Sequence, residues 1–543
     1  MPEQVRHDEL GVVRALNRLR FLVPPALGAI SALGFPPWDA LPLTLIAFAF
    51  WLHLIHEAPT LRRVLAIGWL FGVGHFCVAN AWIQQPFEFQ DAMPHWLGYL
   101  AVLLVSLYLA IYPMLAAGLA WRLASPAAKG DPASSADAAF VLIAGAGWMV
   151  TEYLRGTMFT GYPWDPLALV LIPAGLAQPA WLTGTYALSG CVVVASGALM
   201  LLLQRRWQLA AVSAFIMALA IVGVTLATFP IELTPSPNDP GFMTKPRVRV
   251  VQPNLPEEVR PTDNYAENNF QALAKLSRRT DPAAPPRLIF WPEGAVRFPV
   301  EDGYPPYVYS YLGSAKMARI RMSALLGDND AILTGTQTMR FDKAEDMISA
   351  TNSIVLAGPD ARLHGRYDKA HLVPYGEYLP MRPLLEALGL QRLVPGDVDF
   401  IPGPGPRTMA VPGFGRVGML ICYEVIFSGA TVDPADRPDF LFNPSNDAWF
   451  GNLGPPAHLA QAQLRAIEEG LPVIRSTPTG ISAIIAADGR IIASIPMHTT
   501  GAIEAPIPPR FAPTPFSWFG NWMVAFTAAL LTLIAIAIRR RRG

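Results

Sequence analysis

The stretch Gly418-Met419-Leu420-Ile421-Cys422-Tyr423-Glu424 contains a short apolar run that stops at a cysteine. Apolar runs of this length, bounded by glycine and charged residues, are typical of buried β-strands. The thiol of Cys422 is therefore expected at the carboxyl end of a strand, where ligands bind in an α/β sheet. A lone cysteine at such a place is more often a packing residue than a nucleophile, so a catalytic role for Cys422 needs support from other residues of the chain.

Two further polar residues stand just past apolar strands or on the loops leading from them. Glu293 comes after Leu-Ile-Phe-Trp-Pro, and Lys369 lies in a Tyr-Asp-Lys-Ala-His-Leu-Val-Pro-Tyr-Gly-Glu segment. A thiol must lose its proton to attack a carbonyl, and a neighbouring carboxylate can accept that proton. An ammonium, together with a backbone N–H near the cysteine, can stabilise the negative charge that develops on the carbonyl oxygen. Each residue alone could be a helix cap or a solvated side chain, but the three together favour acyl transfer.

The segment around these residues, 246–509, is predicted to be an α/β domain. Its strands read as continuous apolar runs, which indicates a sheet covered on both faces. The predicted strands are Val248–Gln252, Leu288–Trp291, Ala331–Thr336, Ser353–Leu356, Gly418–Cys422, Phe440–Asn443 and Ser482–Ala487. The predicted helices are Tyr265–Ser277, Tyr307–Leu325 and His458–Glu469.

The rest of the chain is strongly apolar. Hydrophobic residues make up 52% of the sequence and charged residues only 15%, which indicates several membrane spans. The predicted spans are residues 20–34, 40–56, 64–83, 96–121, 138–155, 183–203, 207–228 and 518–538. The sequence thus predicts a membrane domain of about seven helices in 1–230, the α/β domain in 246–509, and one further helix in 517–538.

Basic residues fix the expected orientation of these spans. Arginine or lysine precedes the first span, follows the last, and recurs in every second loop between them, whereas loops 35–39 and 84–95 contain neither. By the positive-inside rule both termini are cytoplasmic. Seven crossings then place the α/β domain on the opposite face of the membrane.

Several other functions are not favoured by the sequence. The formal net charge is zero, so nothing in the overall charge indicates a nucleic-acid partner. Cys77 and Cys191 lie in apolar runs, which leaves Cys422 without a second cysteine to pair with in the α/β domain. There is no P-loop, no glycine-rich dinucleotide turn and no histidine pair at zinc spacing, so neither a metal nor an organic cofactor is expected.

Three segments together resemble a known family. Trp291-Pro292-Glu293, the Lys369 segment through Val373-Pro374-Tyr375-Gly376-Glu377, and Cys422-Tyr423-Glu424 resemble the Glu-Lys-Cys set of the nitrilase, or carbon–nitrogen hydrolase, superfamily. Joined to a membrane bundle, they are similar to the apolipoprotein N-acyltransferase family along nearly the whole chain. The resemblance implies a nitrilase-like αββα sandwich beside an eight-span membrane bundle. It also implies the inner membrane as the location, with the catalytic domain in the periplasm.

The resemblance further implies a role for each matching residue. Glu293 would be the general base, Lys369 the oxyanion stabiliser and Cys422 the nucleophile that carries the acyl chain as a thioester. Glu377 would orient Lys369, and Tyr423 and Glu424 would shape the pocket. The implied reaction takes an acyl chain from a phospholipid and passes it to the α-amino group of the diacylglyceryl-cysteine at the N-terminus of an apolipoprotein.

Other candidates are weaker. Trp449 lies in a segment that resembles a further family motif, and Glu152 and Arg155 stand three residues apart in a predicted span, where their side chains can pair near a lipid entrance. One departure from the family pattern is Arg260-Pro261, where relatives often have a tryptophan.

Two alternatives to acyl transfer remain open at this stage. The first is a membrane-tethered amidase of the nitrilase type, in which water discharges the same acyl-enzyme. The second is a lipoprotein-binding module without catalysis. The multi-span bundle disfavours a simple tether, because one span would be enough for that purpose.

Overall fold

A computed structural model describes residues 21–90, 93–124, 137–207, 245–255, 264–387, 389–393 and 398–540. The chain forms two compact units. The described residues of the first lie within 21–83, 99–207 and 521–540, and those of the second within 84–98 and 245–520. The predicted span 207–228 lies outside the described residues except for residue 207. The Arg260-Pro261 pair also lies outside the described residues.

The second unit contains two six-stranded sheets. The first has the strand order β12-β1-β2-β3-β4-β5, and the second has the order β11-β10-β9-β8-β7-β6. The strands of the first sheet are β1 (Arg247–Gln252), β2 (Arg287–Phe290), β3 (Ala331–Phe341), β4 (Met347–Ala357), β5 (Leu363–Asp368) and β12 (Gly501–Pro506). Those of the second are β6 (Thr408–Val411), β7 (Gly415–Met419), β8 (Phe440–Pro444), β9 (Val473–Ser476), β10 (Ser482–Ile485) and β11 (Ile491–Ile495).

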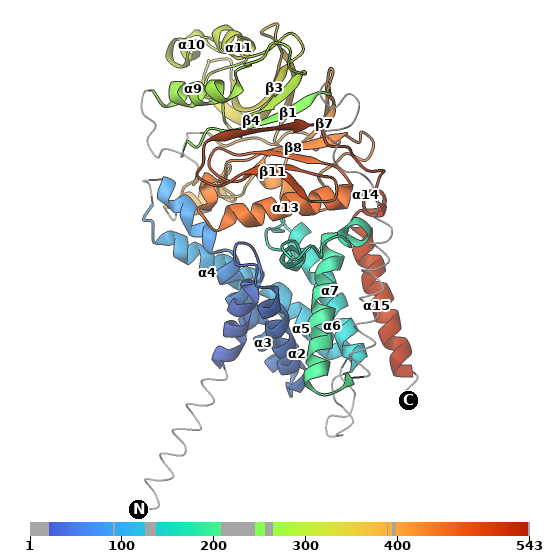
Figure 1. Ribbon diagram of the computed structural model, residues 1–543. Helices are drawn as coiled ribbons and strands as arrows, with labels where there is room; N and C mark the ends of the chain where they lie inside the picture. The colour runs from blue at the N-terminus through green and yellow to red at the C-terminus, as the bar shows by residue number, and fades with distance from the viewer. Residues whose placement is uncertain are drawn as a thin grey trace, which may run out of the picture. The chain divides into compact units, whose positions relative to one another are not determined.

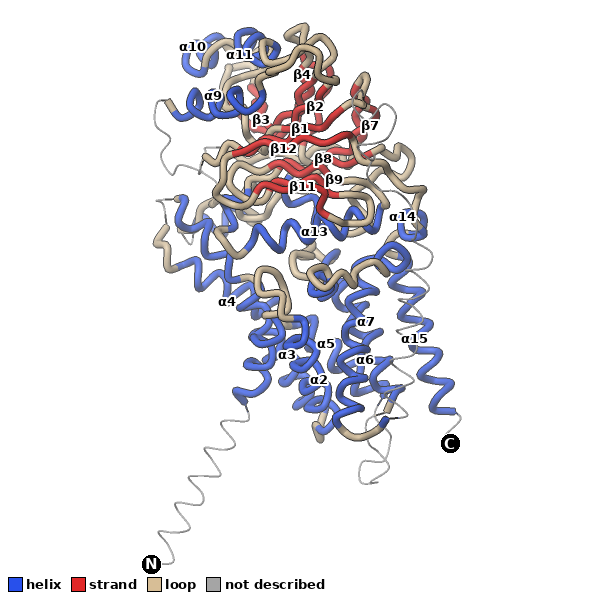
Figure 2. Tube along the Cα trace, viewed as in Figure 1, coloured by secondary structure: helices blue, strands red, loops and turns tan. Residues whose placement is uncertain are grey.

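Helices cover the outer faces of the two sheets, as Figures 1 and 2 show. On the first sheet lie α9 (Tyr265–Ser277), α10 (Pro306–Leu312) and α11 (Ala315–Ser323), and on the second lies α13 (Gly454–Glu469). The short α12 (Arg382–Ala387) and α14 (Pro515–Phe519) and the 3₁₀ turns η4 (Cys422–Ile426) and η5 (Asp447–Phe450) complete the unit. The layers are therefore helix, sheet, sheet, helix.

Large apolar side chains hold these layers together. Between the sheets, the ring of Phe290 on β2 packs on that of Phe442 on β8, with the centroids 4.8 Å apart. Between the first sheet and its helices, Trp291 and Met322 belong to one buried apolar cluster. All four residues of β2 and all five of β8 are buried, which explains why Leu288–Phe290 and Phe440–Phe442 are continuous apolar runs instead of alternating ones.

The strand and helix predictions are largely confirmed, with two corrections. The predicted helix Tyr307–Leu325 is two helices, because Gly313 adopts a positive φ of 91° that ends α10. The predicted strand Gly418–Cys422 ends at Met419, and Cys422 instead opens the turn η4. The strands β5, β6, β9, β11 and β12 were not predicted; β5 and β11 are short and partly polar on their exposed sides.

The first unit is helical. Its helices are Phe21–Ala32, α2 (Leu41–Glu57), α3 (Leu61–Ala79), α4 (Leu97–Leu109), α5 (Ile111–Ala124), α6 (Ala138–Thr157), α7 (Ala180–Leu203) and α15 (Trp522–Arg540), with the 3₁₀ segment η2 (Leu167–Leu171). The 3₁₀ segment η1 (Ala81–Phe89) begins in this unit and continues into the second, and the first two residues of α4 also belong to the second. Four stretches among the described residues are long and apolar enough to cross a membrane: Leu61–Ala79, Leu97–Leu123, Ala180–Leu203 and Trp522–Arg540. Phe21–Ala32 and Leu41–Glu57 are shorter apolar helices.

Small residues allow the helices of this unit to approach closely. A side chain placed at Gly145 on α6 would meet Val194 at 2.6 Å and the carbonyl oxygen of Gly190 on α7 at 3.0 Å. Close packing at glycine is typical of helices that associate within a membrane, where apolar side chains gain little by leaving lipid.

Residues 84–98 separate the apolar helices α3 and α4 in sequence, yet they belong to the second unit. Within that unit, the ring of Phe89 packs edge-on against Trp449 with the centroids 5.1 Å apart. The side chain of Gln85 lies so close to Gly451 that a Cβ there would meet its amide oxygen at 2.9 Å. This loop is therefore part of the sandwich unit rather than a free connection.

Gly335 packs directly against the loop that carries Glu293. A Cβ at Gly335 on β3 would meet the carbonyl oxygen of Pro292 at 2.6 Å and the Cα of Glu293 at 2.7 Å. We expect Gly335→Ala to push this backbone outward, to cost about 1–3 kcal/mol of stability and to slow the chemistry that depends on Glu293. Melting temperature and turnover measure the two effects. Gly501→Ala is the matched control, since its Cβ would make only ordinary contacts at 3.6 Å, and equal behaviour of the two variants would contradict this account.

Candidate active site

The loops that follow the strands place Glu293, Lys369 and Cys422 in one buried site. Glu293 lies on the loop after β2, Lys369 follows β5 directly, and Cys422 begins η4 after β7. The Nζ of Lys369 lies 3.7 Å from Oε1 of Glu293. Cys422 belongs to the same site, because the charges of Glu293 and Lys369 both affect the pKa of its thiol.

Lys369 is a buried ammonium whose charge is balanced by carboxylates. Only 1% of its side chain is exposed, and its Nζ donates to Oε1 of Glu377 at 3.0 Å. Burial by itself lowers the pKa of an amine, but the carboxylates of Glu377 and Glu293 outweigh it, so the pKa of Lys369 is raised. The side chain therefore carries a permanent positive charge in a site that excludes water, where such a charge stabilises an oxyanion most effectively.

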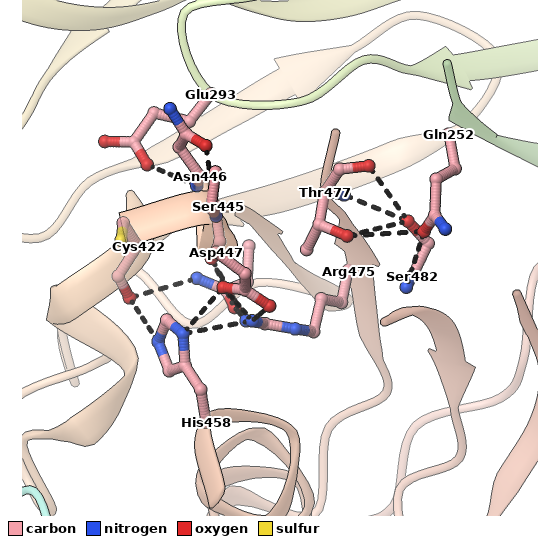
Figure 3. Close-up of polar contacts among 12 residues, drawn as sticks. Gln252, Glu293, Cys422, Ser445, Asn446, Asp447, His458, Arg475, Thr477 and Ser482 are labelled. Atoms are coloured by element: carbon pink, nitrogen blue, oxygen red, sulfur yellow. Dashed lines mark hydrogen bonds and ion pairs between the residues drawn. The ribbon is translucent and has the colours of Figure 1, made fainter. Parts of the chain in front are cut away.

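Glu293 is held by donors from both sheets. Its Oε1 accepts a hydrogen bond from the side-chain amide of Asn352 on β4 at 2.7 Å, and its Oε2 accepts one from the backbone N–H of Asn446 at 2.7 Å, shown in Figure 3. Burial raises the pKa of Glu293, and the nearby ammonium of Lys369 opposes that rise. A carboxylate whose pKa is raised is a stronger base than an exposed one, which suits it to accept a thiol proton.

Cys422 is buried and has an unusual backbone conformation. Its φ is +50°, in the left-handed region that costs a non-glycine residue roughly 1–2 kcal/mol. Burial raises the pKa of its thiol well above the ordinary value, the carboxylate of Glu293 raises it further, and Lys369 lowers it. The resting form is therefore the thiol, and the proton has to move to a base as the sulfur attacks.

Asn352 is a site residue that the sequence did not reveal. Besides its bond to Glu293, its Nδ2 donates to Oε1 of Glu377 at 3.0 Å, so one amide links the two carboxylates. Glu377, which was predicted to orient Lys369, also accepts a hydrogen bond from the backbone N–H of Val373 at 2.8 Å. In the sequence Asn352 is one of several polar residues in a mixed strand, beside Thr351 and Ser353, so nothing singles it out.

Glu424 braces the loop of Lys369 against the turn of Cys422. Its Oε1 accepts hydrogen bonds from the hydroxyl of Tyr367 at 2.8 Å and from the backbone N–H groups of Ala370 and His371 at 2.7 and 3.1 Å. Its Oε2 accepts from the N–H of Ile421 at 2.7 Å. The adjacent Tyr423 packs its ring on Phe427 at 5.2 Å. These contacts place Glu424 between the two loops, while a role for either residue in shaping the pocket stays a prediction.

The weaker candidates form no contact with this set among the described interactions. Trp449 packs on Phe89 as described above. Glu152 and Arg155 belong to the helical unit and are paired at 3.6 Å, as their spacing predicts. The closer partner of Arg155 is the carboxylate of Asp165, which the sequence did not reveal. Asp165 also accepts a hydrogen bond from Asn80 at 3.2 Å.

The fold and the two-part organisation define a class of protein, a carbon–nitrogen hydrolase domain joined to an apolar helical unit. Residues 247–514 match the family model described as carbon-nitrogen hydrolase. Residues 27–199 match the model described as the apolipoprotein N-acyltransferase N-terminal domain.

Relatives of nearly the same length agree with both matches. Apolipoprotein N-acyltransferase of Caulobacter vibrioides is 34% identical and covers 95% of this chain and 94% of its own length. The enzyme of Ralstonia nicotianae is 33% identical over 97% of this chain and 95% of its own length. The enzyme of Rhodopseudomonas palustris is 30% identical over 98% of this chain and 98% of its own length. The chain belongs to the apolipoprotein N-acyltransferase family. Among solved structures, an amidase of the nitrilase superfamily from Nesterenkonia AN1 is 17% identical, with a TM-score of 0.32, over 49% of this chain and 92% of that one.

The bond from Asn352 makes a testable contribution to the pH dependence of the reaction. Because this bond lowers the pKa of Glu293, its removal in Asn352→Leu raises that pKa. A general base works only when ionised, so we expect the acid limb of the rate of acyl-enzyme formation to move to higher pH. A single-turnover pH profile measures it. Thr338→Val on the neighbouring strand is the control, since Thr338 bonds Thr351 instead, and an unmoved limb in Asn352→Leu would contradict the assignment.

The brace formed by Glu424 predicts an effect on stability. In Glu424→Gln, the amide nitrogen cannot accept a hydrogen bond, so at least one backbone N–H is left facing a donor. We expect a loss of about 1–3 kcal/mol, measured as a lower melting temperature. Glu386→Gln changes the same groups in a half-exposed pair with Arg382 and should have little effect. If the two variants melted together, the proposed brace would be wrong.

Proposed function

We propose that this enzyme transfers a fatty acyl chain from a phospholipid to the α-amino group of the diacylglyceryl-cysteine of an apolipoprotein, through a thioester on Cys422. The family supplies the acyltransferase activity and its acceptor, and the alternative in which water is the normal acceptor is less supported. The observation that carries the residue assignment is the buried set of Lys369, Glu377 and Glu293 around the thiol.

In the first step, the sulfur of Cys422 attacks the ester carbonyl of the phospholipid. The thiol proton passes to the carboxylate of Glu293 as the carbon–sulfur bond forms. The negative charge on the carbonyl oxygen is stabilised by the ammonium of Lys369 and a backbone N–H. When the tetrahedral intermediate collapses, the carbon–oxygen bond breaks and the lysophospholipid leaves with the proton from Glu293. The acyl chain remains on sulfur.

In the second step, the uncharged α-amine of the acceptor attacks the thioester. Glu293 accepts a proton from the amine nitrogen, the same donors stabilise the oxyanion, and the carbon–sulfur bond breaks. The departing sulfur takes the proton back, so the thiol is regenerated and an amide is formed. Glu377 keeps Lys369 charged through both steps, since it holds the ammonium at 3.0 Å.

The lipid nature of both substrates explains the apolar helical unit. Moving an acyl chain out of the bilayer into water costs about 0.8 kcal/mol for every buried CH₂ group. An enzyme embedded in the membrane avoids this cost. We propose eight spans in all, with residues 1–230 and 517–538 in the inner membrane, 246–509 as the catalytic domain in the periplasm, and both termini in the cytoplasm.

The loop of residues 84–98 supports this orientation. The distribution of basic residues predicts it on the non-cytoplasmic face, and its Phe89 packs on Trp449 of the sandwich unit. A loop and a domain that pack together have to lie on the same side of the membrane. For Trp449, Glu152 and Arg155 we propose roles on the lipid side of the reaction, supported by the aromatic contact of Trp449 and the buried ion pair of the other two.

The acyl-enzyme can be detected directly. On incubation of the purified protein with a defined phosphatidylethanolamine, we expect intact mass to increase by one acyl chain that hydroxylamine removes. Cys422→Ala should form no adduct. Lys369→Met should form it slower by a factor of about 10²–10³, the usual effect of removing one oxyanion donor. Lys316→Met changes an exposed lysine of α11 and serves as the control. An adduct on Cys422→Ala, or equal rates in the two lysine variants, would contradict the mechanism.

A further inference from the structure

A second group of buried polar residues lies on the opposite side of Cys422 from Glu293. It consists of His458 on α13, Asp447 on η5 and Arg475 on β9, whose side chains are 0% exposed. Nε2 of His458 lies 3.2 Å from the carbonyl oxygen of Cys422, and the side-chain amide of Asn443 donates to the same oxygen at 3.4 Å. The chemical steps above do not use this group.

The contact with Cys422 fixes one proton of His458. The carbonyl oxygen of Cys422 can only accept, so Nε2 must carry a proton and donate it. Nδ1 lies 3.0 Å both from Nη2 of Arg475, which is a donor, and from Oδ1 of Asp447, which is an acceptor. Burial, together with the charge of Arg475, lowers the pKa of His458, which favours a neutral ring.

The other two members hold the histidine in place. Nη2 of Arg475 lies 2.7 Å from each carboxylate oxygen of Asp447, and Nη1 donates to the side-chain oxygen of Asn443. Burial alone would raise the pKa of Asp447, but Arg475 outweighs it and the pKa is lowered, so the pair is ionised and balanced. Gly480 closes the group, since a Cβ there would meet Oδ2 of Asp447 at 2.3 Å.

The oxygen that this group holds belongs to the peptide bond between Cys422 and Tyr423. A trans peptide is planar, so its N–H points away from its carbonyl oxygen. Figure 3 shows the sulfur of Cys422 on the side of Glu293 and the carbonyl oxygen on the side of His458. The N–H of Tyr423 is thereby directed away from His458. Because Cys422 has a strained φ of +50°, its backbone needs such a restraint to keep this orientation.

We infer that His458, held by Asp447 and Arg475, is a positioning residue that orients the Cys422–Tyr423 peptide so that the N–H of Tyr423 stabilises the oxyanion. The inference rests on the proposed role of Cys422 as the nucleophile. His458 acts through the carbonyl oxygen of Cys422, to which its Nε2 donates. The alternative is a purely structural role, in which His458, Asp447 and Arg475 only stabilise the sandwich.

Two reactions of the same thiol separate these possibilities. Thioester formation from a phospholipid passes through an oxyanion at the carbonyl group. In the reaction with methyl methanethiosulfonate, the sulfur of Cys422 attacks a sulfur atom of the reagent and displaces methanesulfinate, so no oxyanion forms at a carbonyl group. His458→Leu removes the donor to the carbonyl oxygen, and His458→Gln keeps an amide N–H in a similar place. Gln463→Leu is the matched control, because Gln463 lies on the same helix and donates to the carbonyl oxygen of Gly489 at 2.8 Å. Peptide mapping follows the reagent at Cys422 alone, and a melting curve accompanies each variant.

We expect His458→Leu to slow thioester formation about a hundredfold, the effect of a small misplacement in an active site. Its half-saturating phospholipid concentration and its methanethiosulfonate rate should stay at the parent values. His458→Gln should recover much of the lost rate, and Gln463→Leu should lose none. A parallel fall in both reactions, or equal thioester rates in the leucine variant and the parent, would overturn the inference. Because Cys422→Ala tests the nucleophile separately, a normal rate in His458→Leu would leave the proposed function standing.

Discussion

The buried ammonium of Lys369 is the constraint on which the rest of the site depends. An uncompensated charge in a protein interior costs several kcal/mol, and only 1% of the Lys369 side chain is exposed to solvent. Two carboxylates balance it, and these need donors in turn. Asn352 supplies one donor from the first sheet, and Asn446 supplies another from the loop after β8 of the second. The site is therefore complete only when both sheets have closed on each other.

Cys422 lies between two polar groups with different tasks. In the proposed mechanism, the group with Glu293 and Lys369 carries the charges that change or respond during the reaction. The group with Asp447 and Arg475 is an ionised pair whose charges cancel, with a neutral histidine between it and the peptide of the cysteine.

Apolar strand patterns indicated Glu293 and Cys422, which stand just past predicted strands, and the resemblance of its flanking segment indicated Lys369, which follows the partly polar strand β5. These patterns could not reveal residues defined by distant partners. Asn352 is a polar residue in a strand, and its two partners stand 59 and 25 positions away. His458 is one histidine of an amphipathic helix whose partner at Cys422 stands 36 positions away. Family resemblance supplied the αββα arrangement, since a strand such as β5, with the sequence Leu-His-Gly-Arg-Tyr-Asp, carries too few apolar residues to be recognised alone.

The central claim is that the thioester on Cys422 is an intermediate that an amine, rather than water, normally discharges. The most direct measurement isolates the acyl-enzyme and follows its intact mass in the presence and absence of a diacylated lipopeptide. We expect the lipopeptide to remove the acyl chain quickly and to emerge as the N-acyl amide, while the acyl-enzyme persists in buffer alone. Discharge at the same rate with and without lipopeptide, with free fatty acid as the product, would contradict the central claim.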